Sequence, residues 1–335
     1  MKLRKWTAAL LALLLALLCV CAGAEGAFSG ASYDAGLAVV GGEVYCAAPN
    51  VGLRSIPIWH VSWDGLEKVR SRIGGWNGLY ALDGELLTVE PVLNIGEMLG
   101  SIPTSTCRAG RLDPAKGKYR SLETYVRATE DGVCNVFAAQ GSAYRDVREG
   151  DVHVLQRLDG GAWTTVAQWT GDHAWVYETF CIIGDRNADR PRYVALYDFS
   201  TGQIHDVTAL DRKYALTGSS LEAVLENGVL YLLKGNGLMA LDLSTGQAEQ
   251  VVALPEEMNG FILTPERLIL LSSIRKQAWV MDRRSWKIVS TVSMTEYPLH
   301  AALVDGRLYV YCSYGDAGVE IIDLATGESV YYPLN

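Results

Sequence analysis

Two of the five histidines stand where a side chain could act as a general base. His173 and His300 lie near expected connections between strands, and Asp172 directly precedes His173. An imidazole beside a carboxylate is suited to proton transfer near neutral pH. Neighbouring residues on a strand point to opposite faces, so Asp172 and His173 need not touch. Because no nucleophile or second acid accompanies either histidine, no catalytic residue is assigned, and all three residues are predicted to contact a ligand.

Three tryptophans, at positions 76, 169 and 175, fall at or near expected connections between repeats. An exposed ring there could stack on a sugar or clamp a peptide, and packing between repeats is the alternative role. Trp76 and Trp175 are therefore included among the predicted ligand contacts.

Long stretches without strand character are expected at residues 90–103, 138–150 and 184–192. Long loops are often functional, so these stretches favour a binding surface on the part of the chain that contains them. Their polar and aromatic residues complete the predicted set. The predicted ligand contacts are Trp76, Tyr144, Arg145, Asp172, His173, Trp175, Arg192 and His300.

No metal or cofactor site is predicted. Asp185, Asn187 and Asp189 have the spacing of the first calcium ligands in an EF-type loop, but Arg190 stands at the glycine position and Leu196 at the bidentate acid. An ordinary solvated turn is favoured there. The sequence also lacks a serine hydrolase elbow and a phosphate-binding glycine loop.

Five cysteines follow the N-terminal leader, at positions 46, 107, 134, 181 and 312, with no Cys-x-x-Cys pair. This pattern gives no support for zinc or thioredoxin-like chemistry. Free cysteines packed as small apolar residues are expected. A disulfide between Cys46 and Cys312 is the open alternative, because both fall on the second strand of repeats that become neighbours in a closed ring.

The N-terminus has the pattern of a secretory signal. Lys2, Arg4 and Lys5 precede an apolar run over residues 8–20, and Ala22-Gly23-Ala24 supplies small residues for cleavage after Ala24. An uncleaved anchor is the alternative. The sequence thus predicts a signal peptide at 1–24, an N-terminal segment at 25–35, one domain at 36–335, and a secreted or extracytoplasmic protein without a transmembrane segment after cleavage.

Charge argues against a nucleic-acid partner. The chain has 29 Lys and Arg against 38 Asp and Glu, and loss of the three basic residues of the leader gives 26 against 38, a net charge of −12. Nucleic-acid binding requires a basic face. We therefore expect no such partner.

A turn of Asp, three residues and Gly recurs along the chain. Asp side chains bond backbone N–H groups two residues on, and Gly supplies the left-handed conformation of a tight turn, so these aspartates are expected to be structural. Shortened forms occur, and one copy carries Trp in place of Gly. The markers are Gly65, Gly117, Gly161, Gly202, Gly246, Trp286 and Gly327, at intervals of 40 to 52 residues.

This period, with four strands per unit, is typical of propeller blades. Seven markers predict an all-β, seven-bladed β-propeller of four-stranded antiparallel blades, with six or eight blades less favoured. Helical periodicity is absent after the leader. The last blade is expected to complete itself with residues 330–334, because 26–32 make a poor strand. The blades are predicted at 36–73, 78–125, 128–169, 173–210, 216–254, 260–292 and 299–334.

Three of the turns carry a family resemblance, at residues 196–203, 241–247 and 322–328. They read Leu-Tyr-Asp-Phe-Ser-Thr-Gly-Gln, Leu-Asp-Leu-Ser-Thr-Gly-Gln and Ile-Asp-Leu-Ala-Thr-Gly-Glu. They resemble the Asp-x-x-Thr-Gly turn of the PQQ-like and YVTN-type propeller superfamily, most strongly over residues 190–335. Members with quinone cofactors carry a tryptophan shortly after Thr-Gly. Here Ile-His-Asp, Ala-Glu-Gln and Ser-Val-Tyr follow, so the resemblance implies no quinone.

Two functional hypotheses follow. The first is an exported, non-catalytic binding or scaffold propeller that recognises a protein segment or a cell-envelope polymer. Its ligand, protein or carbohydrate, would bind the face formed by the B–C and D–A loops, and we expect a monomer. The alternative is a propeller enzyme, a lyase or carbohydrate-active hydrolase, with carboxylates and His173 or His300 at the mouth of the central channel. Convergent carboxylates and a histidine there would favour the enzyme.

Overall fold

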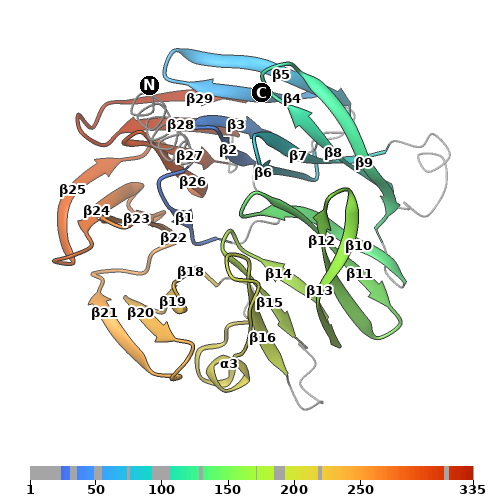
Figure 1. The fold of residues 1–335 in the computed structure, drawn as a ribbon. Coiled ribbons are helices and arrows are strands. Elements are labelled where there is room, and N and C mark those ends of the chain that lie inside the picture. Colours follow the sequence, from blue (N-terminus) through green and yellow to red (C-terminus); the bar gives the residue numbers. More distant parts are fainter. Residues whose placement is uncertain are drawn as a thin grey trace, which may run out of the picture.

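The computed structural model describes residues 24–30, 36–48, 55–73, 76–92, 106–127, 131–170, 172–184, 193–217, 221–312 and 317–334. These residues form seven antiparallel sheets arranged around a central axis (Figure 1), so the predicted seven-bladed β-propeller is confirmed. In each blade the strands follow one another in chain order from the axis to the rim, as strands A to D.

The first three blades are those with the longest outer strands. Blade 1 contains β2 (Leu37–Val40), β3 (Glu43–Ala47), β4 (Ser55–Ser62) and β5 (Gly65–Ile73). Blade 2 contains β6 (Gly78–Leu82), β7 (Glu85–Pro91), β8 (Thr106–Asp113) and β9 (Lys118–Val126). Blade 3 contains β10 (Gly132–Ala139), β11 (Ser142–Glu149), β12 (Val152–Asp159) and β13 (Ala162–Thr170).

The remaining four blades follow the same plan. Blade 4 contains β14 (Asp172–Val176), β15 (Phe180–Gly184), β16 (Val194–Asp198) and β17 (Ile204–Asp206). Blade 5 contains β18 (Ala223–Glu226), β19 (Val229–Leu233), β20 (Gly237–Asp242) and β21 (Ala248–Ala253). Blade 6 contains β22 (Gly260–Leu263), β23 (Arg267–Ser272), β24 (Gln277–Asp282) and β25 (Lys287–Ser293). Blade 7 contains β26 (Pro298–Val304), β27 (Arg307–Cys312), β28 (Gly318–Asp323) and β29 (Ser329–Pro333).

The repeated Asp turns act as the sequence predicts. Asp198 accepts hydrogen bonds from the backbone N–H groups of Ser200 and Thr201 at 2.8 and 3.3 Å, and Gly202 adopts φ +71°. Trp286 takes the same left-handed conformation, at φ +54°, in the copy that lacks glycine. The turn geometry is therefore retained despite the steric cost of a side chain at positive φ.

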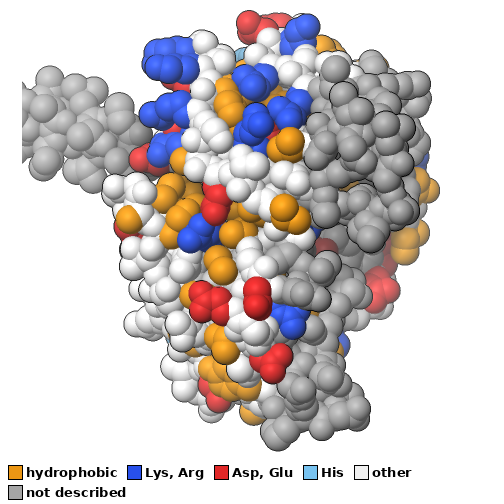
Figure 2. Space-filling view, turned by 90° about the vertical axis from the view of Figure 1, so that its right-hand side faces the viewer, with side chains coloured by type: hydrophobic (Ala, Val, Ile, Leu, Met, Phe, Trp, Pro, Cys, Tyr) orange, Lys and Arg blue, Asp and Glu red, His pale blue; other side chains and the backbone are white. Residues whose placement is uncertain are grey.

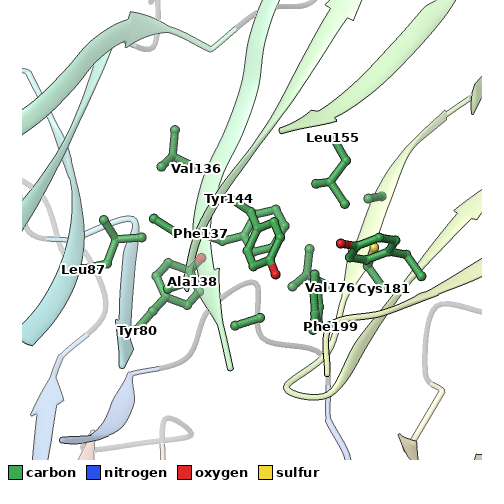
Figure 3. Packing of buried hydrophobic residues seen from close by; sticks show 14 of the residues in the cluster. Tyr80, Leu87, Val136, Phe137, Ala138, Tyr144, Leu155, Val176, Cys181 and Phe199 are labelled. Carbon is green, nitrogen blue, oxygen red and sulfur yellow. The ribbon is translucent and has the colours of Figure 1, made fainter. Parts of the chain in front are cut away.

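The hydrophobic core lies between neighbouring blades, because each inner strand is buried on both faces. One cluster joins blades 2, 3 and 4, and Figure 3 shows its rings gathered between β10 and β11 and the strands of blade 4. Tyr144 lies 4.8 Å from Phe199 and 5.7 Å from Phe137, measured between ring centroids. The contact with Phe199 packs blade 3 against blade 4.

The ring closes as predicted, with blade 7 completed by its own outer strand β29. All five described cysteines are free, so the alternative disulfide is not formed. Cys46 belongs to a cluster that joins blade 1 to blades 7 and 2, whereas Cys312 faces blade 6. The two thiols therefore point into different blade interfaces.

Two elements were not predicted. The helix α3 (Thr208–Tyr214) follows β17. At seven residues it makes about two turns, too few for its periodicity to stand out. It is anchored by the buried residues Asp211 and Tyr214, and it displaces the start of blade 5 from the predicted residue 216 to Ala223.

The second is the strand β1 (Ala27–Phe28), which belongs to the N-terminal segment. It pairs antiparallel with β22 and adds a fifth strand to the inner edge of blade 6. Figure 1 shows it running near the centre of the ring. The first residues that the structure describes therefore lie inside the central channel.

Among the residues that the structure describes, none lies in a helix with both the length and the apolar character needed to cross a membrane.

Candidate functional site

A cavity of about 580 Å³ lies in the central channel. The inner strands β2, β6, β10 and β26 and the N-terminal segment supply most of its wall. It extends to the A–B turns of blades 1 to 3, at Gly41, Gly84 and Gly141. We call this space the channel cavity. It reaches the end of the propeller opposite to the B–C and D–A loops, and ligand binding at those loops stays a prediction.

Glu178 is an acidic residue that lines the channel cavity. It lies in the A–B turn of blade 4, and its carboxyl accepts a hydrogen bond of 2.7 Å from the backbone N–H of Phe28. Burial raises the pKa of Glu178 to about 7, and this hydrogen bond opposes the rise. The carboxyl therefore titrates near neutral pH, a property frequent in functional sites.

Glu222 places a second carboxyl against the N-terminal segment. The hydroxyl of Ser29 donates a hydrogen bond of 2.6 Å to it, and burial raises the pKa of Glu222 to about 7. Ser29 is fully buried, and its hydroxyl also accepts a hydrogen bond of 2.8 Å from the backbone N–H of Phe261. One serine thus joins the N-terminal segment to blades 5 and 6.

His300, a predicted ligand contact, lines the same cavity from β26. Its ring lies 4.5 Å from that of Phe28, and its Nδ1 is buried without a hydrogen-bond partner among the described residues. Burial lowers the pKa of His300 to about 4, so the ring is neutral at pH 7. The structure gives no hydrogen bond between His300 and Glu178 or Glu222 in the described part of the chain.

The tryptophans predicted near the mouth are buried rather than presented to a ligand. Trp76 and Trp175 are each 6% exposed, and the Trp76 indole donates a hydrogen bond of 3.1 Å to the carbonyl of Ile56. Trp169 is also buried and stacks on His153. All three are therefore packed in the protein interior, and ligand contact by Trp76 and Trp175 stays a prediction.

The expected loop at 138–150 is in fact a tight turn followed by strand β11, so that expectation was wrong. The sequence signal was missed because Arg145, Asp146 and Arg148 interrupt the apolar pattern. Tyr144 is 1% exposed and lies in the core. Arg145 bonds Glu123 at 2.6 Å and Gln156 at 2.7 Å, and these bonds hold it between blades 2 and 3. Their role in ligand binding stays a prediction.

The other predicted contacts are less fully described. Asp172 and His173 lie on β14, the inner strand of blade 4, although their side chains are outside the described part. Arg192 and the calcium-like stretch 185–189 also lie outside the described residues.

A polar cluster that the sequence did not indicate lies in blade 3. Cys134, Asp146 and His153 come from three adjacent strands, and their ligand-type atoms all lie within 4.8 Å of one another. His153 Nδ1 lies 2.8 Å from Oδ1 of Asp146, although Asp151 is closer to His153 in the sequence. Burial, followed by the charge of Asp146, raises the pKa of the Cys134 thiol to about 11. A thiol in this state is the opposite of an activated nucleophile.

The rim of blades 1 and 2 carries a group of basic residues on its outer strands. Figure 2 shows Lys and Arg gathered toward the top of the side that faces right in Figure 1. Several are paired with acids: Arg111 and Arg120 both contact Glu85, and Arg72 contacts Glu90 at 2.9 Å. The local charge is therefore partly neutralised.

Comparisons with known proteins place the chain only at the level of its fold. No family model matches it, and no curated protein matches it significantly. A form of KlHsv2 whose loop 6CD is replaced by a Gly-Ser linker is 11% identical with a TM-score of 0.50, over 90% of this chain and 96% of that one. BamB from Moraxella catarrhalis is 10% identical with a TM-score of 0.48, over 92% and 99% of the two chains. At identities this low, similarity to a solved structure bears on the fold alone and gives no information on activity.

Proposed function

We propose that this protein is an exported, non-catalytic β-propeller that binds an extended protein segment in the channel cavity. One observation carries the proposal: residues of the chain's own N-terminal segment already lie in the channel as an added strand, with Ala27 opposite Leu263 and Phe28 opposite Ile262. A channel that holds one extended peptide by backbone pairing is suited to hold another.

Backbone groups of three blades hold this segment. The N–H of Glu25 donates to the carbonyl of Leu303 at 2.7 Å, and the carbonyl of Ser29 accepts from the N–H of Ala223 at 2.9 Å. On the other side of the cavity, the inner strands β2, β6 and β10 form the wall. Inner strands present backbone N–H and C=O groups along their free edge, which an extended ligand can pair with.

The finer assignments belong to the same proposal. The pattern of the N-terminus supports export with cleavage after Ala24, which would leave Glu25, already docked in the channel, at the new N-terminus. The Thr-Gly turns support membership of the PQQ-like and YVTN-type superfamily. A cell-envelope polymer is the second ligand class, with the B–C and D–A loops as its surface.

The enzyme hypothesis has one observation in its favour. Burial raises the pKa values of Glu178, which lines the channel cavity, and of Glu222, which contacts the N-terminal segment, to about 7. A carboxylic acid that is protonated near neutral pH can serve as a general acid. Each carboxyl, however, accepts a hydrogen bond from the N-terminal segment. Because both carboxyls hold the N-terminal segment in place, their role favours a binding protein over an enzyme.

A pair of matched variants tests where the ligand binds. Asp83 is exposed at an A–B turn and lines the channel cavity, whereas Glu149 is exposed beside a B–C turn of blade 3. A random-peptide phage library would be selected on the immobilised protein. Affinity of the selected peptide for the wild type, Asp83→Trp and Glu149→Trp would then be measured by fluorescence anisotropy.

The proposal expects an enriched peptide whose affinity falls about tenfold or more in Asp83→Trp, a loss of roughly 1.4 kcal/mol, and stays unchanged in Glu149→Trp. The reverse pattern would move the site to the B–C and D–A face. Failure to enrich any peptide would reject a protein segment as the ligand.

A further inference from the structure

We propose that Cys134, Asp146 and His153 form a binding site for a zinc ion in blade 3. The three side chains come from adjacent strands, β10, β11 and β12, and their candidate ligand atoms lie within 4.8 Å of one another. Thiolate, imidazole and carboxylate are the side-chain ligands that zinc uses in proteins.

The distances suit a tetrahedral ion. Bonds of about 2.0 to 2.3 Å place neighbouring ligand atoms about 3.4 Å apart. The Asp146 and His153 atoms, now 2.8 Å apart, would separate slightly. The thiol sulfur, now at most 4.8 Å from the other two ligand atoms, would move about one ångström closer to them. Rotation of side chains about their χ angles can supply movements of this size.

A backbone irregularity places the thiol. The pairing of β10 with β11 shifts between Val133 and Asn135, so Cys134 is the extra residue of a β-bulge. Bulges re-aim side chains and are frequent beside functional sites. Asn135 is paired with Asp146, which brings the bulged cysteine next to the carboxylate.

The surroundings fix two ligands and leave the third accessible. Asp146 and His153 are 1% and 3% exposed, and the imidazole stacks on Trp169 at 5.3 Å between ring centroids. Cys134 is only half-buried and gives the ion a route of entry. With three protein ligands in the described part of the chain, a fourth position is open to water or to a ligand atom.

The site lies toward the B–C and D–A face, far along the strands from the A–B turns that the channel cavity reaches. His153 is the second residue of β12, and Cys134 the third of β10. The zinc site therefore stands apart from the proposed function. A peptide in the channel cavity and an ion in blade 3 would be bound independently.

Cobalt binding tests the proposal directly. The purified protein, treated with a chelator and then dialysed, would be titrated with Co²⁺ and afterwards with Zn²⁺. We expect one equivalent of Co²⁺, with a thiolate-to-metal absorption band that Zn²⁺ abolishes by displacement. Cys134→Ser should remove that band, and His153→Ala should weaken binding by about tenfold or more. Cys312→Ala, in blade 7, should bind as the wild type does.

Alkylation of thiols gives a second readout that does not depend on the variants. In the folded wild type, Cys134 is the half-buried cysteine of the five that the structure describes, so iodoacetamide should modify it first. Zinc should suppress that modification. A folded wild type that takes up neither ion, or a Cys134→Ser protein that binds cobalt unchanged, would overturn the proposal.

Discussion

The backbone N–H of Phe28 donates a hydrogen bond of 2.7 Å to the carboxyl of Glu178, 150 residues further along the chain. Phe28 belongs to the strand added to blade 6, whereas Glu178 lies in an A–B turn of blade 4. The bond therefore links the N-terminal segment, which is paired with blade 6, to blade 4. It couples the docking of the N-terminal segment to the protonation of a partly buried acid.

Glu178→Gln should change how stability depends on pH. The folded pKa of about 7 lies above the ordinary 4.5, so the folded state keeps a proton that the unfolded state releases between these values. The stabilisation that the protonated Glu178 gives the folded state is complete below pH 4.5 and is lost as pH rises to about 7. The shift corresponds to roughly 3 kcal/mol. The denaturant midpoint of the variant should therefore rise relative to that of the wild type between pH 5 and pH 8. A difference between the two midpoints that does not change with pH would contradict this pKa.

Ser29→Ala should destabilise the protein by about 1 to 3 kcal/mol. The substitution leaves the buried N–H of Phe261 without its acceptor and the partly buried Glu222 without its donor. Urea unfolding monitored by tryptophan fluorescence would measure the loss. Ser121→Ala, on an exposed position of the outer strand β9, is the matched control. Equal midpoints for the two variants would show that the N-terminal segment is not docked in solution.

Asp198→Ala should be more harmful than Asp242→Ala, although both replace the same turn residue. The Asp198 carboxyl is buried and accepts bonds from two backbone N–H groups and from the hydroxyls of Ser200 and Thr201. Its loss should cost on the order of 2 kcal/mol. Asp242 is more exposed, so water can replace its partners. Thermal unfolding of the two variants measures the order, and a larger effect at Asp242 would contradict it.

The blade count could be read from the sequence because the turns have strict local requirements. A turn that needs positive φ selects Gly, and the Asp side chain that bonds its backbone lies within the same few residues. Even the exception was visible, since Trp286 occupies the glycine position and keeps the conformation. Seven such turns were enough to place seven blades.

The sites could not be read in the same way, because they depend on residues that meet across strands. Asp146 and His153 are seven positions apart and face each other only through the register of β11 and β12. Glu178 meets Phe28 although 150 residues separate them in the sequence. Tyr144 was expected in a loop because charged neighbours masked the strand, although its ring is buried in the core. Pairings of this kind need the topology before they can be predicted.

Tyr144→Ala and Tyr144→Phe together distinguish a core residue from a ligand contact. The ring packs against Phe137 and Phe199 at the interface of blades 3 and 4 (Figure 3), so its removal should cost about 3 to 5 kcal/mol. Phenylalanine keeps the ring, and its cost should be much smaller because only the hydroxyl is lost. Denaturant unfolding measures both values. An alanine variant as stable as the wild type would show that the ring does not support the blade interface, and would return Tyr144 to the surface role first predicted for it.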